Sequence, residues 1–181
     1  NLYQSFNAVA KKEVEVPVKP TARDLLRTNL SFDIDSVYCS PSKRSIQTAR
    51  LVTSYPKVLE ELMEIGFKME DFISEQDFYN QQGKPRVLEA RKSFVKALIH
   101  NNLEESYEEV FNRIELLLKL ILQDKSETIL IFSHGFLMKV IEAYIKDPSI
   151  KNYPKRLLKY FDGTVETFKF CEGFMLEITK N

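Results

Sequence analysis

The most pronounced pattern in the sequence is an apolar run over 128–132, Thr-Ile-Leu-Ile-Phe, with no polar alternation. Such a run is typical of a strand that is buried on both faces, as in a parallel sheet. Residues 136–145 follow with apolar positions at helical spacing. Ser133, His134 and Gly135 stand between the two. The pattern therefore predicts a strand-to-helix junction with three chemically distinctive residues at its turn.

A second junction of the same kind lies earlier in the chain. Residues 34–39 alternate, so that Val37 and Cys39 share one face of a strand and Tyr38 takes the other. A Ser-Pro pair ends this strand, and a helical apolar stripe runs over about 43–54. Two strands that each lead directly into a helix indicate a layered α/β fold.

The rest of the chain adds elements around these junctions. Residues 56–85 carry mixed charge and a Gln-Gly-Lys-Pro turn, and they predict an irregular or partly helical excursion. We expect one domain over 9–181, a three-layer α/β/α fold with a mostly parallel sheet and a helical insertion at about 56–110. The other expected elements are strands at 14–18, 164–170 and 174–179, the last two as a hairpin, and helices at 21–28, 86–101 and 104–124.

Composition narrows the classes of function. Lys+Arg and Asp+Glu both number 26 among 181 residues, and this zero net charge argues against a dedicated nucleic-acid binder. No run of 18 apolar residues predicts a membrane helix, and no basic-then-apolar start predicts a signal peptide. The two cysteines, Cys39 and Cys171, form no disulfide framework, so we expect a reducing, cytoplasmic location. Nothing in the sequence predicts the oligomeric state.

The junction at His134 is the first candidate site. In open α/β sheets, ligands bind where the strands end. The N–H groups and dipole at the start of the following helix favour an anion, and Gly135 allows the backbone to approach a ligand closely. The alternative is a histidine of the core whose ring is simply satisfied by its neighbours.

The junction after residue 39 offers Arg44. A cation in the first turn of a helix gains nothing from the helix dipole, so a guanidinium there makes sense if it binds a phosphate or carboxylate. The alternative is a solvated surface arginine. A thiol phosphatase is not indicated, because only four residues separate Cys39 from Arg44 and that signature needs five. Cys39 is better interpreted as a small buried apolar residue.

Carboxylates gather in the first half of the excursion, at Glu60, Glu61, Glu64 and Glu70. A glutamate flanked by apolar residues can have a raised pKa and act as a general acid, but a solvated acidic face is a serious competitor. Spacing alone does not choose among them. His100 stands at a helix end, where capping is expected. Two histidines without nearby ligand spacing predict no metal site, and no phosphate loop or dinucleotide motif predicts a cofactor.

Together these segments resemble the histidine phosphatase superfamily, with its phosphoglycerate-mutase-like fold, over about 17–180. Two motifs carry the resemblance most specifically, and three further segments are similar to it more loosely. The specific motifs are Ser40-Pro41-x-x-Arg44-x-x-x-Thr48-Ala49 and Ser133-His134-Gly135; the looser segments are Pro17 to Arg23, Leu62-x-Glu64 and Phe161 to Val165.

The resemblance implies a two-step phosphoryl transfer, in which a histidine of an Arg-His-Gly motif takes the phosphoryl group and water or a second substrate removes it. It implies that Arg44 and His134 clamp the phosphoryl oxygens and that Glu64, or else Glu61, donates the proton. The implied ligand is a phosphorylated small molecule or a phosphate or sulfate anion. No cofactor and no metal are implied, and neither nucleic acid nor membrane is expected as a partner.

This sequence departs from the family pattern at the nucleophile, because it contains no Arg-His-Gly. Gln4-Ser5-Phe6-Asn7 resembles the residues that come directly after that motif in the family, which would make Ser5 and Asn7 substrate-binding residues. Residues 1–8 are therefore either a remnant of the first-strand motif or a protease-site remnant of an expression vector. Phe136 stands where the family usually has a second glycine, and we expect it to narrow the pocket.

Three functions are consistent with these observations. The first is a phosphomonoesterase, or a mutase, whose nucleophile lies outside these 181 residues. The second is a catalytically inactive pseudophosphatase that binds a phosphorylated ligand or protein partner. The third is an interaction module that uses residues 56–124.

Overall fold

The computed structural model describes residues 3–4, 33–83, 85–162 and 173–177. Three described strands form one sheet in the order β2-β1-β3, and both pairings are parallel. In the register of β1 with β3, Cys39 lies opposite Phe132, so these two strands end side by side. The strands are β1 (Ser36–Cys39), β2 (Lys57–Val58) and β3 (Ile129–Phe132).

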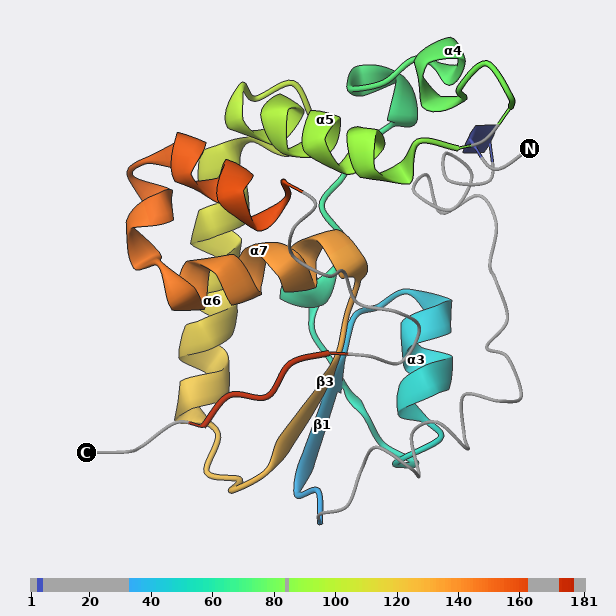
Figure 1. The fold of residues 1–181 in the computed structure, drawn as a ribbon. Helices are drawn as coiled ribbons and strands as arrows, with labels where there is room; N and C mark the ends of the chain where they lie inside the picture. Colours follow the sequence, from blue (N-terminus) through green and yellow to red (C-terminus); the bar gives the residue numbers. More distant parts are fainter. Residues whose placement is uncertain (1–2, 5–32, 84, 163–172, 178–181) are drawn as a thin grey trace.

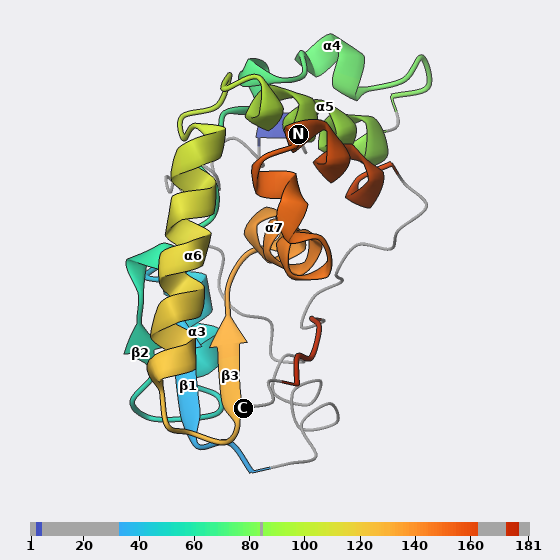
Figure 2. The same ribbon diagram turned by 90° about the vertical axis from the view of Figure 1, so that its left-hand side faces the viewer.

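Helices cover both faces of this sheet, which confirms the three-layer α/β/α fold (Figures 1 and 2). Val37 and Cys39 pack with Ala49 of α3 (Lys43–Ala49) on one face. Tyr38 packs on the other face with α6 (Tyr107–Gln123) and α7 (Gly135–Lys146). The alternation expected over 34–39 is thus confirmed, because neighbouring residues of a strand point to opposite faces.

The strand β3 differs from its prediction. All four of its residues are half-buried, where the apolar run predicts burial on both faces. Within the described part of the chain, β3 pairs only with β1 and lies at an edge of the sheet.

The excursion is partly helical, as predicted, and it lies beyond the carboxyl ends of the strands (Figure 1). Its helices are η1 (Glu60–Leu62), η2 (Met69–Asp71) and α4 (Glu75–Phe78). The helix expected at 86–101 follows it as α5 (Val87–Ile99). Two short helices after α7 were not predicted, and each has a proline in its first turn, where the missing N–H costs nothing. They are η3 (Pro148–Lys151) and η4 (Pro154–Tyr160).

Several boundaries differ from expectation. The helix predicted to reach residue 54 ends at Ala49, because the N–H groups of Leu51 and Val52 bond to carbonyls only three residues back and tighten the turn. The strand expected at 174–179, the second arm of the hairpin, has no regular structure over 174–177. The elements expected at 14–18, 21–28 and 164–170 lie outside the described residues.

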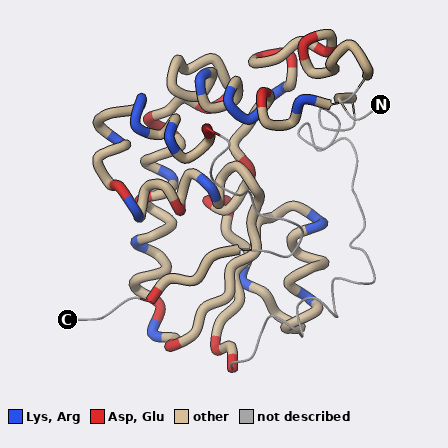
Figure 3. The backbone as a smooth tube through the Cα atoms, viewed as in Figure 1, with Lys and Arg blue, Asp and Glu red and all other residues tan. Residues whose placement is uncertain are grey.

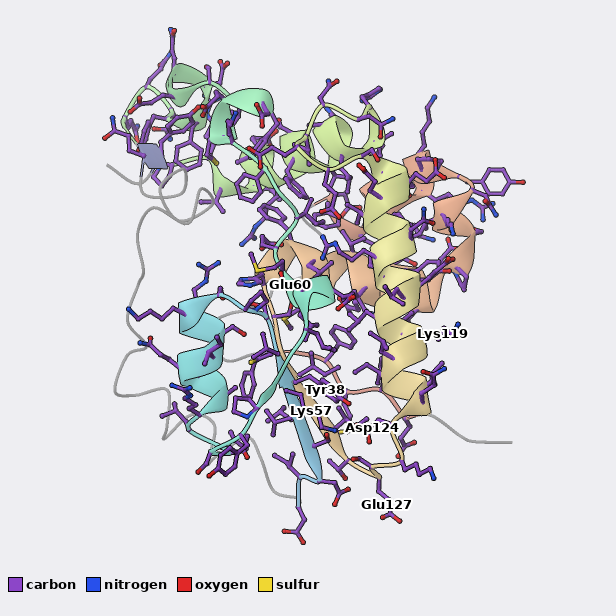
Figure 4. The ribbon with its side chains drawn as sticks, turned by 180° about the vertical axis from the view of Figure 1, so that it is seen from behind. Tyr38, Lys57, Glu60, Lys119, Asp124 and Glu127 are labelled. Atoms are coloured by element: carbon purple, nitrogen blue, oxygen red, sulfur yellow. The ribbon has the colours of Figure 1, made fainter. Side chains whose placement is uncertain are left out.

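A polar network ties β1, β2 and the end of α6 together at the back of the sheet (Figure 4). The Asp124 carboxylate accepts hydrogen bonds from the Tyr38 hydroxyl, from Lys57 Nζ at 2.9 Å and from Ser36 Oγ at 3.3 Å. The hydrogen bonds from Tyr38, Ser126 and Lys57 hold the pKa of Asp124 well below its usual range. The hydrogen bonds to Asp124 and Tyr38 also raise the pKa of Lys57. Three elements of the fold therefore meet at one carboxylate.

Charges of both signs are interspersed along the described helices (Figure 3). No helix among the described residues is long and apolar enough to cross a membrane. With no charge excess over the whole chain, the electrostatics of any site depend on the side chains next to it.

Candidate functional site

The two predicted junctions meet at one edge of the sheet. Because β1 and β3 end side by side, the residues after them are neighbours, and the N–H of Ser40 donates to the carbonyl of Phe132 at 3.0 Å. Arg44 stands in the first turn of α3 and donates from Nη2 to Nδ1 of His134 at 2.9 Å. The second ring nitrogen of His134, Nε2, lies 2.7 Å from the hydroxyl of Ser40. The structure thus joins the two motifs through their chemically active side chains.

The partners of His134 define where its ring carries a proton. A guanidinium can only donate hydrogen bonds, so Nδ1 must accept from Arg44 and the ring proton stands on Nε2. Nε2–H then donates to Ser40 Oγ. A histidine with this tautomer cannot take a proton from Ser40, which rules out a serine–histidine nucleophile in this arrangement. His134 is only 6% exposed, so it is both a satisfied histidine of the core and the direct partner of Arg44.

Arg44 is not the solvated surface arginine of the alternative interpretation. Its side chain is half-buried and hydrogen-bonded to His134. Burial lowers the pKa of its guanidinium, and the negative charge of Glu64 raises it. A guanidinium stays charged at neutral pH despite such shifts. The site therefore holds one fixed positive charge with several N–H donors.

The side chain of Glu64 lies against the N-terminal end of α7. Its carboxylate accepts from the N–H groups of Leu137 at 2.9 Å, Phe136 at 3.2 Å and Ile65 at 3.1 Å. Burial raises the pKa of Glu64, while these three N–H groups and the charge of Arg44 act to lower it. The helix terminus that the sequence predicts as an anion site thus binds the protein's own carboxylate.

The structure separates Glu64 from the other glutamates of its cluster. Glu60 and Glu70 are exposed, and Glu61 contributes its main-chain carbonyl to a hydrogen bond with Arg113. Only Glu64 contacts the residues that follow His134. Sequence spacing could not identify Glu64, because the choice depends on its contact with the first turn of α7, which is distant in the sequence.

Gly135 begins α7 without a positive φ, and a Cβ built on it would meet no described atom within 4 Å. Packing therefore does not require glycine here, and the space beside it is open to the approach of a ligand. Ser40, by contrast, was not predicted as a site residue beyond its place in the motif. Its hydroxyl is buried and contacts both His134 and Ser42, at 2.9 Å from Ser42 Oγ.

The sequence model of the histidine phosphatase superfamily (branch 1) matches residues 20–173. The chain belongs to the histidine phosphatase superfamily. A comparison with curated proteins gives no match.

Two solved structures are similar to this member of the histidine phosphatase superfamily. "Mycobacterial hydrolase 1" is 15% identical with a TM-score of 0.41, over 75% of this chain and 66% of its own. A phosphoserine phosphatase mutant from Entamoeba histolytica, in complex with phosphoserine, is 18% identical with a TM-score of 0.39, over 77% of this chain and 73% of its own. This chain thus spans slightly less than two thirds of the first of these structures.

Phe136 replaces the second glycine that histidine phosphatases usually carry, and its ring packs toward the excursion. It stacks on Phe94 of α5, with ring centroids 3.9 Å apart and an interplanar angle of 20°. It also meets Phe67 edge-on at 5.6 Å. The expectation that Phe136 narrows the pocket stays a prediction; what the structure shows is that it joins the first turn of α7 to the helical insertion.

Other predicted residues are placed outside this constellation. Ser5 and Asn7 lie outside the described residues. His100 is exposed at the end of α5, with Nδ1 2.6 Å from the carbonyl oxygen of Lys96, in the capping position that its sequence context predicts. Cys39 is fully buried and its burial raises the thiol pKa, as expected for an apolar role. No cluster of metal-ligating side chains occurs among the residues that the structure describes.

Proposed function

We propose that the protein is a phosphomonoesterase of the histidine phosphatase superfamily that acts through a phosphohistidine, with the nucleophilic histidine outside the 181 residues. The observation that carries this proposal is the hydrogen-bonded pair of Arg44 and His134 at the ends of two adjacent parallel strands. A charged guanidinium held against an imidazole at a sheet edge is suited to bind phosphoryl oxygens. The ligand of this proposal is a phosphorylated small molecule in the cytoplasm.

Each side chain has one task in the proposed reaction. Arg44 and His134 bind the oxygens of the phosphoryl group as it moves from the ester oxygen to the histidine nitrogen. Glu64 gives its proton to the departing ester oxygen, and burial, which raises its pKa, favours the protonated form that this task needs. Water then releases inorganic phosphate. Gly135, Ser5 and Asn7 are proposed to contact the substrate.

A pseudophosphatase is the second candidate, and one observation favours it. The sequence has two histidines, and neither stands in an Arg-His-Gly motif. His100 is exposed at a helix end, and His134 is engaged by Arg44 and Ser40. A protein without the nucleophile would keep the anion site but lose the covalent route.

Binding of inorganic phosphate tests what the two candidates share. We expect calorimetry to detect binding, and Arg44→Ala to weaken it about 10–100-fold, the loss of a charge-assisted interaction of about 1.5–3 kcal/mol. Arg50→Ala is the matched control, because Arg50 is exposed at the other end of the same helix. If Arg44→Ala bound phosphate with the same affinity as the unsubstituted protein, the proposed site would be contradicted.

Turnover then separates the two candidates. Hydrolysis of p-nitrophenyl phosphate, together with an acid-labile phosphohistidine in the intact mass, would establish the enzyme. N-terminal sequencing of the same sample would show whether an Arg-His-Gly segment precedes the motifs described here. Phosphate binding that depends on Arg44, without any turnover or phosphohistidine, would establish the pseudophosphatase.

A further inference from the structure

Three consecutive main-chain carbonyls just before Glu64 are held by side chains from other elements. Arg113 of α6 donates from Nη1 to the carbonyls of Glu61 and Met63, both at 2.8 Å. Ser133 donates from its hydroxyl to the carbonyl of Leu62 at 2.8 Å. Loop carbonyls are ordinarily left to water, so three successive protein donors fix this short segment unusually firmly.

Arg113 is itself fixed in place. Its Nε and Nη2 donate to the two carboxylate oxygens of Glu105, each at 2.7 Å, in a bidentate pair. The two side chains are only 17% and 21% exposed. Because a bidentate pair fixes the guanidinium plane, it directs Nη1 at the two carbonyls. Glu105 thus orients Arg113, and Arg113 orients the chain that leads into Glu64.

The carboxyl group of Glu64 is held at its other end by the first turn of α7, through Phe136 and Leu137. These two residues follow His134 by two and three positions. The main chain before Glu64 is held by Arg113 and Ser133, and its carboxyl group is held by the N–H groups at the start of α7. Together these contacts fix where the carboxyl group lies relative to the proposed phosphoryl site.

We propose that Arg113, oriented by Glu105, is a positioning residue that sets where the Glu64 carboxyl group stands beside the Arg44–His134 pair. This inference rests on the proposed function, in which Glu64 protonates the leaving group. Arg113 touches neither substrate nor reacting atoms, and it acts only through the main chain at Glu61 and Met63. The competing interpretation is that Arg113 merely ties η1 to α6.

Leaving-group dependence distinguishes positioning from simple structural support. An alkyl phosphate needs a proton donor at the leaving oxygen, whereas p-nitrophenolate leaves without one. Displacing a catalytic group by about 1 Å costs about 100-fold. We therefore expect Arg113→Lys, which keeps the charge but cannot bind Glu105 bidentately, to lower kcat/KM for β-glycerophosphate about 10–100-fold and that for p-nitrophenyl phosphate much less.

The matched control is Glu115→Gln, which breaks an ion pair on the same helix. Glu115 binds Lys151 at 2.7 Å and Tyr144 at 2.9 Å and has no contact with 61–64 among the described hydrogen bonds. Glu115→Gln should have the same kcat/KM as the unsubstituted protein for both substrates. Glu105→Gln should reproduce the effect of Arg113→Lys in part, and the double variant should be no worse than Arg113→Lys, because the two residues act as one unit. Equal losses on both substrates would overturn the proposal.

A second measurement keeps the inference testable if the protein shows no turnover. The amide signals of Phe136 and Leu137 in NMR spectra should follow the titration of Glu64, since both donate to its carboxylate. Arg113→Lys should move the midpoint of that titration and Glu115→Gln should not. Unchanged midpoints in Arg113→Lys would overturn the positioning role, whether or not the phosphatase proposal stands.

Discussion

The imidazole of His134 accepts a hydrogen bond where a phosphoryl clamp would need to donate one. Its Nδ1 is bound to Arg44, and its Nε2–H is directed at the buried hydroxyl of Ser40. If an anion binds the Arg44 guanidinium and draws it away from the ring, Nδ1 of His134 loses its hydrogen-bond donor. A negative charge beside the ring then favours protonation of Nδ1, because opposite charges stabilise each other. We therefore expect anion binding at the proposed site to be coupled to proton uptake by His134.

This coupling can be measured with sulfate, which does not titrate near neutral pH. We expect sulfate binding to take up as much as about one proton, seen by calorimetry in buffers of different ionisation enthalpy. His134→Asn should bind sulfate without the uptake, with its fold checked by circular dichroism. Binding to the unsubstituted protein with no change in protonation would show that the Arg44–His134 bond persists in the complex.

For individual residues, the sequence identifies which side chains belong to the candidate site better than it predicts which side chains they bond to. Arg44 and His134 are visible because each stands in a short motif at a strand-to-helix junction. Their bond is not visible, because it joins residues 90 positions apart. Arg113 carries no sequence signal at all, since an arginine on an amphipathic helix ordinarily faces water.

Among the elements, β1, β2 and the end of α6 depend on one carboxylate. Asp124 accepts hydrogen bonds from Tyr38, Ser36 and Lys57 (Figure 4). The hydrogen bonds from Tyr38, Ser126 and Lys57 lower its pKa and so favour its ionised form. A carboxyl group whose pKa is lowered in the folded protein contributes stability above its unfolded pKa, and that contribution is lost as the pH falls. The contact between the sheet and α6 should therefore weaken in acid.

Asp124→Asn should lower the melting temperature at pH 7, because the amide cannot replace the ionised acceptor. The difference from the unsubstituted protein should shrink as the pH falls below about 4, the ordinary pKa of aspartate. Melting curves between pH 7 and pH 3 check this. Glu127→Gln, an exposed carboxylate near the same helix end, is the control and should leave the curves in place. A difference that is constant with pH would refute the electrostatic account.

Element boundaries were predictable where local hydrogen bonds set them. The helix expected at 104–124 begins at Tyr107, directly after Ser106, whose side chain and that of Glu109 each bond the other's N–H group. The half-burial of β3 was not predictable from its own residues, because apolar periodicity does not show what covers each face of a strand.

Over the whole molecule, an aromatic cluster joins the helical insertion to the candidate site. Phe94 is fully buried in α5 and stacks on Phe136, whose N–H group donates to Glu64. Phe67 and Phe72 meet the Phe94 ring edge-on at 5.5 and 5.7 Å. Such ring pairs stabilise beyond their buried area, so the insertion and the first turn of α7 should respond together.

Phe94→Leu should lower the free energy of unfolding by about 1–2 kcal/mol and also weaken phosphate binding. Phe78→Leu is the matched control, since Phe78 is equally buried but packs on Tyr3 and Tyr79, away from α7. It should lose similar stability and keep its affinity. Urea unfolding measures the free energy of unfolding, and calorimetry measures the phosphate affinity. Equal phosphate affinities in Phe94→Leu and Phe78→Leu would show that the insertion does not influence the site.

The parallel pairing of β1 with β3 has a consequence for the time at which the protein matures. The pairing encloses the whole excursion and α6, so closing it costs the entropy of a long loop and cannot precede synthesis of residue 134. Contacts this distant in sequence form slowly in folding. A nascent or truncated chain can therefore build α6 and still lack the Arg44–His134 pair, which forms only after the two strand ends meet.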